Sequence, residues 1–183
     1  MTASITAIAA RPFVFKNVYL SLSLPAFLKL IPGAKTVVVQ RDPNTVLSSV
    51  FAMRNQLPPH VWQSIRPPFV SDVKNEDVLS QSAYQCVRSQ QLLSAATESL
   101  PAEKLLTYGY EDLCRDPAGF VAAVSEWTSL TPRESARVPD HFAPSQGPGL
   151  PDDLAQRATE IVASLNETGE AYLARVQAYP KRR

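Results

Sequence analysis

The segment from residue 34 to residue 53 constrains the fold more than any other, because it joins a strand pattern to a helix start. Residues 36–39 are four consecutive β-branched residues, and such a run without polar alternation predicts a strand buried on both faces, as in parallel sheets. Asp42 follows as a helix N-cap, and Pro43 takes the first helical position, where its missing N–H costs nothing. The segment therefore predicts a strand, a turn and a helix that runs to about residue 54.

Arg41 stands at the carboxyl end of this strand, which is where open α/β sheets bind their ligands. The helix start offers free N–H groups and a positive dipole end, and a guanidinium matches phosphate geometry. Thr45 and Ser49 lie four and eight residues after Arg41, on one helix face, so the Ser49 hydroxyl can reach the same anion. The alternative is that Arg41 is a solvated charge and Ser49 faces solvent.

The remaining patterns alternate strands with helices, which predicts one α/β domain over residues 1–183 with a three-layer parallel sheet flanked by helices. Proline-rich stretches predict loops, and a C-terminal loop and helix are expected over residues 131–183. The expected strands lie near residues 13–16, 36–40 and 104–109, and the expected helices near residues 22–31, 43–54, 75–100, from Asp112 or Asp116 to about 127, and 154–176.

Composition narrows the functional classes. A net charge of +1 argues against broad nucleic-acid or membrane-surface binding, which needs a concentrated positive field. No apolar run approaches the roughly 20 residues of a membrane span, and no secretory leader is evident, so a cytoplasmic protein is expected. Cys86 and Cys114 lack paired spacing, so neither a disulfide framework nor a metal site is expected.

Two segments together resemble a known family. The pattern Arg-Asp-Pro-x-x-Val-x-x-Ser from Arg41 to Ser49 is similar to the 3′-phosphate-binding segment of sulfotransferases that use 3′-phosphoadenosine 5′-phosphosulfate (PAPS). A second block has Leu-Pro at residues 100–101, Tyr-Glu-Asp-Leu at 110–113 and Asp-Pro at 116–117, which resembles a later part of the same domain. The resemblance spans about residues 11–130 and implies a sulfotransferase fold similar to that of P-loop NTPases.

This resemblance implies roles for four residues. Arg41 and Ser49 would hold the 3′-phosphate of PAPS or of its product PAP, Tyr110 would lie by the adenine, and Lys16 would lie near the transferring sulfonate. From the residues alone, the alternative for Tyr110 is a buried tyrosine bonded to the backbone, and the alternative for Lys16 is a solvent-facing strand end. No catalytic base is identifiable, because His60 and His141 both fall in proline-rich loops.

The expected reaction is transfer of a sulfonate from PAPS, as cosubstrate without a metal, to a hydroxyl or amine of a small molecule or sugar. The family's glycine-rich loop for the 5′-phosphosulfate is not found before Phe13, so the chain is expected to be the distal part of the domain, truncated or divergent and incomplete at its N-terminus. A second chain or self-association would then cover the sheet.

Two other functional classes remain open from the sequence. One is a non-catalytic nucleotide-binding or interaction protein that retains the fold. The other is a relative of phosphoryl transferases, which is disfavoured because no Walker-type lysine motif is present.

Overall fold

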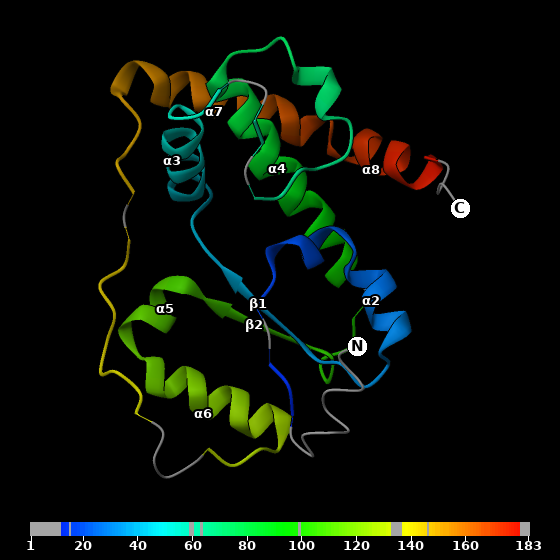
Figure 1. Cartoon of the computed structure of the whole chain (residues 1–183), viewed down its shortest axis with the longest axis vertical. Coiled ribbons are helices and arrows are strands. Elements are labelled where there is room, and N and C mark those ends of the chain that lie inside the picture. The colour runs from blue at the N-terminus through cyan, green and yellow to red at the C-terminus, as the bar shows by residue number, and fades with distance from the viewer. Residues whose placement is uncertain are drawn as a thin grey trace.

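The computed structural model describes residues 12–14, 16–58, 61–62, 64–98, 100–132, 137–145 and 147–179. Two strands lie in the middle of the molecule with helices on either side (Figure 1). The elements in chain order are η1 (Val18–Leu22), α2 (Leu24–Leu30), β1 (Thr36–Gln40), α3 (Pro43–Arg54), η2 (Val70–Val73), α4 (Val78–Thr97), β2 (Leu105–Gly109), α5 (Tyr110–Arg115), α6 (Pro117–Thr128), α7 (Asp152–Glu167) and α8 (Gly169–Ala178).

The sheet consists of β1 and β2, which pair in parallel from Thr36 beside Leu105 to Gln40 beside Gly109. Between the two strands the chain passes through α3 and α4, as a parallel crossover requires. The strands predicted near residues 36–40 and 104–109 are therefore confirmed, and so is a parallel sheet flanked by helices.

The strand predicted near residues 13–16 is wrong for the residues that can be described. Pro12, Val14 and Lys16 have no strand conformation, while Phe15 lies outside the described residues. The Asn17 side chain accepts a hydrogen bond from the Tyr19 N–H at 2.9 Å, and this cap starts the 3₁₀ helix η1 at once. The chain thus turns into a helix directly after Asn17, and residues 12–14 and 16 pair with neither strand of the sheet.

The prediction that β1 is buried on both faces is also wrong. Thr36 and Val38 are partly buried, but Val37 and Val39 are 36% and 43% exposed. Helices α5 and α6 both contact β2, and the valine face of β1 stays open to solvent among the described residues. The β-branched run correctly predicts a strand, but burial depends on which other elements cover it.

The core lies between helices rather than on the sheet. Helices α3, α4 and α7 enclose one cluster, and helices α4 and α8 with η2 enclose a second (Figure 1). The first cluster comprises Leu47, Leu79, Ala83 and Ala158, and the second Val70, Tyr84 and Tyr172. The N-terminal part of α3 is therefore attached to the best-packed region of the molecule.

The single helix predicted over residues 154–176 is divided into α7 and α8 at Thr168. Arg88 of α4 explains the break, because its guanidinium donates to the Leu165 carbonyl at 2.9 Å and to Thr168 Oγ1 at 2.8 Å. A cation at the end of α7 satisfies its carbonyls and suits the negative end of the helix dipole. Gly169 begins α8 where an added Cβ would lie 2.8 Å from Gln91 Nε2, so a larger residue would require the Gln91 side chain to move.

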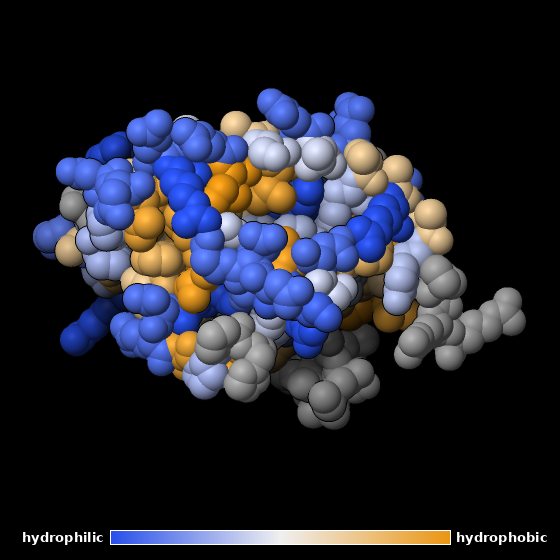
Figure 2. Space-filling model, turned by 90° about the horizontal axis from the view of Figure 1, so that it is seen from above, coloured by the Kyte–Doolittle hydropathy of each residue, from blue (hydrophilic) through white to orange (hydrophobic). Residues whose placement is uncertain are grey.

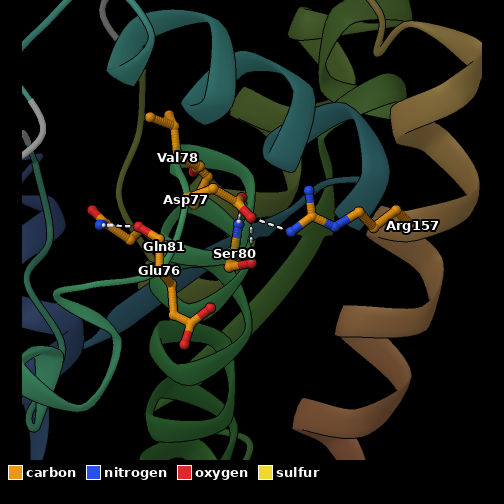
Figure 3. A network of polar contacts seen from close by, with 7 residues as sticks. Glu76, Asp77, Val78, Ser80, Gln81 and Arg157 are labelled. Carbon is orange, nitrogen blue, oxygen red and sulfur yellow. Dashed lines mark hydrogen bonds and ion pairs between the residues drawn. The ribbon is translucent and has the colours of Figure 1, made fainter.

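The start of α4 is tied to α7 through Asp77 (Figure 3). The Asp77 carboxylate accepts a hydrogen bond from the Ser80 N–H at 3.0 Å and pairs with Arg157 of α7. Nearby, Gln81 Nε2 donates to the Glu76 carbonyl at 2.8 Å. Burial raises the pKa of the Asp77 carboxyl, but the Ser80 amide and Arg157 outweigh it, so this pKa lies below its ordinary value.

Replacing Asp77 by alanine is expected to lower the free energy of unfolding by about 0.5–2 kcal/mol, because α4 loses its N-cap. The folded-state pKa is depressed, so the carboxylate contributes stability above the ordinary aspartate pKa of about 4 and loses it as pH falls through the folded value. Urea unfolding of wild type and Asp77→Ala at neutral and acidic pH checks this. A difference in stability that stayed constant as the pH fell below about 4 would contradict it.

The surface seen from above in Figure 2 carries mainly hydrophilic side chains, with hydrophobic surface exposed between them. Among the described residues, no helix has both the length and the apolar character that a membrane span requires.

Candidate functional site

The candidate site lies where the two parallel strands end. Gln40 pairs with Gly109, so the next residue along each strand, Arg41 and Tyr110, leaves the same edge of the sheet. The Arg41 guanidinium carbon lies 4.5 Å from the centre of the Tyr110 ring, a cation–π contact. The structure thus places side by side two residues that lie 69 positions apart and that the sequence singled out separately.

The start of α3 is built as the sequence predicted. Asp42 caps the helix, and its Oδ1 accepts hydrogen bonds from the Thr45 N–H and the Thr45 hydroxyl, both at 2.8 Å. The Thr45 amide is the main cause of an Asp42 pKa below its ordinary value, so Asp42 stays charged at neutral pH. Thr45 is therefore committed to the cap, and the hydroxyls that remain for an anion lie one turn further along α3.

Those hydroxyls belong to Ser48 and Ser49. A Cβ on Gly147 would lie 3.0 Å from Ser49 Oγ and 3.4 Å from Ser48 Oγ, so both serines face the segment that contains Gly147. In that same segment the Ser145 N–H donates to the Tyr110 hydroxyl at 3.2 Å. Ser145 and Gly147 therefore link Tyr110 with Ser49. Arg41, the third predicted cofactor-binding residue, joins this group through its contact with Tyr110.

Ser48 was missed by the sequence analysis. It lies seven residues after Arg41, close to two full turns at 3.6 residues per turn, and this spacing could have singled it out. Only the long-range contact with Gly147 shows that its hydroxyl faces the same place as that of Ser49.

Arg41 retains unused hydrogen-bonding capacity. Its Nε is buried and has no hydrogen-bond partner in the described part of the chain. Buried donors in folded proteins are normally satisfied, so this Nε is free to donate to a bound acceptor such as an anion. The guanidinium can still stack on Tyr110 while it donates from its edge.

Two other arginines are more deeply buried, and each also has a buried Nε without a hydrogen-bond partner among the described residues, but their remaining guanidinium contacts are structural. Arg54, 2% exposed, donates to Gln81 and lies 4.1 Å from the Trp62 ring centre, while Arg88, 6% exposed, caps α7. Desolvation lowers the pKa of both guanidinium groups. These contacts join α3 to α4 and α4 to α7, so both residues are assigned to the core.

Lys16, the predicted catalytic cation, is not brought to this group. Its side chain is exposed, and it makes no hydrogen bond or ion pair with Arg41, Ser49 or Tyr110 among the described residues. Its role stays a prediction. His141 is exposed, His60 lies outside the described residues, and the searched part of the chain contains no cluster of residues that could hold a metal ion.

Comparison with known protein families decides the classification. The family model described as the sulfotransferase family matches residues 4–134. This chain belongs to the sulfotransferase family. The matched region contains Lys16, Arg41, Ser49 and Tyr110, and it ends before Ser145 and Gly147. No curated protein and no solved structure matches the chain.

Proposed function

We propose that this sulfotransferase-family chain binds PAPS and transfers its sulfonate to a hydroxyl or amine of a small-molecule or sugar acceptor. The observation that carries the proposal is the packing of Arg41 on Tyr110 at the shared carboxyl edge of β1 and β2, next to the start of α3. A guanidinium with an unsatisfied Nε, a helix start and serine hydroxyls together suit a phosphate monoester.

In this proposal Arg41 donates to the 3′-phosphate, Ser49 adds a hydroxyl donor, and Tyr110 lies beside the adenine. The acceptor oxygen or nitrogen attacks sulfur, the bond from sulfur to the bridging phosphate oxygen breaks, and PAP leaves. Lys16 would neutralise charge on that bridging oxygen, because cations stabilise charge that develops in the transition state. The acceptor's proton passes to a base that the described residues do not identify.

Transfer of radiolabelled sulfonate from PAPS to a panel of phenols, alcohols, amines and sugars tests this function. We expect labelled product with one PAP released per transfer. Replacing Lys16 by alanine is expected to lower kcat by about a hundredfold, as for loss of one charge-stabilising donor, and to change PAPS affinity much less.

Lys29→Ala is the matched control for this experiment, because Lys29 is an exposed lysine at the end of α2. Equal kcat values for wild type and Lys16→Ala would remove Lys16 from the mechanism. Absence of transfer to every acceptor in the panel would argue against an enzyme.

A non-catalytic nucleotide-binding protein is the second candidate. It is favoured by one observation: Arg41 and Tyr110 meet, and Ser49 faces Gly147 close by, while Lys16 makes no hydrogen bond or ion pair with them among the described residues. PAP binding without any sulfonate transfer would support this second function over the first.

We also propose that the two-stranded sheet is part of the three-layer sheet of the P-loop-like sulfotransferase fold, completed by a second chain or by self-association. The exposed faces of Val37 and Val39 support it, because parallel strands are normally covered on both sides. Sedimentation equilibrium checks self-association, and a chain that stays monomeric at high concentration would contradict that form of the proposal.

A further inference from the structure

Two neighbouring hydroxyls of α3 face one point in space. Gly147 has no Cβ, but a Cβ added to it would occupy this point. That position lies 3.0 Å from Ser49 Oγ and 3.4 Å from Ser48 Oγ. Hydroxyl groups rotate freely and donate one hydrogen bond each, so a single oxygen near this point could accept from both serines. This arrangement lies on the second turn of α3, whose first turn carries the positive end of the helix dipole.

Ser48 has no use in the structure as it stands. Its side chain is buried, with the residue only 4% exposed, and its Oγ has no hydrogen-bond partner among the residues described. Burying a hydroxyl without a partner costs folding free energy. The Nε of Arg41, at the start of the same unit, is unsatisfied in the same way. Ser48 on the second turn of α3 and Arg41 just before the helix are thus both free to donate to a bound acceptor.

The space beside these hydroxyls is taken by a strap, defined here as residues 142–145 and 147. The Phe142 N–H donates to the Cys114 carbonyl at 2.7 Å, and the Ser145 N–H donates to the Tyr110 hydroxyl at 3.2 Å. The strap then reaches α3 at Gly147. The described residues between 137 and 151, which include the strap, run along the edge of the molecule toward α7 (Figure 1).

The strap is lightly held. All of its described residues are exposed, and Phe142 itself is 47% exposed. A Cβ lies about 1.5 Å from its Cα, so an anion oxygen placed at the meeting point of the two hydroxyls would collide with the Gly147 backbone. An anion and the strap therefore compete for the same position.

We propose that Ser48 is a further anion-binding residue and that the strap covers the Ser48–Ser49 hydroxyl pair until a phosphate group displaces it. The inference rests on the proposed function, because it takes the phosphate to be the 3′-phosphate of PAP. It adds Ser48, which is not part of the pattern from Arg41 to Ser49, as a residue that binds the phosphate. It also adds the strap, which lies beyond the residues that the family model matches. In the free protein the strap then covers the hydroxyl pair, and it opens when the nucleotide binds.

The first test is Ser48→Ala, titrated with PAP and with adenosine 5′-phosphate, which lacks the 3′-phosphate. PAP affinity is expected to fall roughly fivefold to tenfold, as for one hydroxyl bonded to an anion, while affinity for adenosine 5′-phosphate stays the same. The melting temperature of the free protein is expected to stay equal or rise, because an unsatisfied buried group is removed. Unchanged PAP affinity, or an equal loss for both nucleotides, overturns the assignment of Ser48.

The second test compares Gly147→Ala with Gly149→Ala. Both glycines have positive φ, +68° and +72°, so alanine strains the backbone at both. Only Gly147 faces the serines, since a Cβ on Gly149 meets nothing within 4 Å. Gly147→Ala is expected to disfavour the closed strap and tighten PAP binding by about threefold or more, because a larger fraction of the protein is competent to bind. Gly149→Ala is expected to bind PAP like the wild type.

The outcomes separate the two proposals. Weaker or unchanged PAP binding by Gly147→Ala, with the wild type binding PAP, overturns the covering role of the strap and leaves the proposed function intact. Binding by Gly147→Ala but not by wild type supports a strap that closes the site fully. Failure of every variant to bind PAP overturns both proposals.

Discussion

Replacing Arg41 by alanine is expected to weaken PAP binding at least tenfold. The substitution removes a charge-assisted, bidentate contact worth about 1.5–3 kcal/mol, and each 1.4 kcal/mol corresponds to a factor of about ten in Kd. It also removes the cation that packs on the Tyr110 ring at 4.5 Å, so the ring loses its fixed neighbour. Isothermal titration calorimetry with PAP measures the change directly.

Two further variants make this measurement specific. Arg41→Lys keeps the charge but not the planar fork, so its PAP affinity is expected to lie between those of wild type and Arg41→Ala. Arg66→Ala removes an exposed arginine from the proline-rich segment before η2 and is expected to bind PAP normally. Equal PAP affinity of wild type and Arg41→Ala would refute the placement of the 3′-phosphate at Arg41.

The elements that the sequence predicted well are those that consecutive residues determine. Residues 36–39 form a strand because β-branched side chains favour extended backbone, and Asp42 with Pro43 starts α3 because capping and a fixed φ act within four residues. The same short-range pattern predicted that Arg41 stands at the carboxyl end of β1.

The errors have long-range causes. The break at Thr168 has a local signal in Gly169, but it also depends on Arg88, which lies 80 residues earlier. The exposure of Val37 and Val39 depends on which helices cover the sheet. Ser48 gains its significance only through Gly147, nearly 100 residues later.

For the candidate site, the sequence supplied the residue types and the structure supplied their proximity. Arg41 and Tyr110 were selected from separate motifs, and the parallel register that ends at Gln40 and Gly109 is what places them together. Lys16 had no comparable geometric support, because the strand expected to carry it is not formed at its described residues. Its proposed role is therefore tested by the kcat of Lys16→Ala and not by the structure.

The largest loss of stability is expected from Leu47→Ala. Leu47 is 1% exposed and packs with Leu79 and Ala83 of α4 and Ala158 of α7, so truncation leaves a cavity where three helices meet. Substitutions of this kind lower the free energy of unfolding by about 2–5 kcal/mol. For a chain of this length that corresponds to a fall in Tm of roughly 4–20 °C.

Leu47 also immediately precedes Ser48 and Ser49, so the helix that presents the candidate anion site is anchored by the residue that this variant removes. Leu30→Ala is the matched control, because Leu30 ends a helix with 82% of its surface exposed and is expected to change stability by less than about 0.5 kcal/mol. Urea unfolding of the three proteins measures both effects. Similar midpoints for Leu47→Ala and Leu30→Ala would mean that α3 is not packed on α4 and α7, and the rigid placement of both serines would then lose its physical basis.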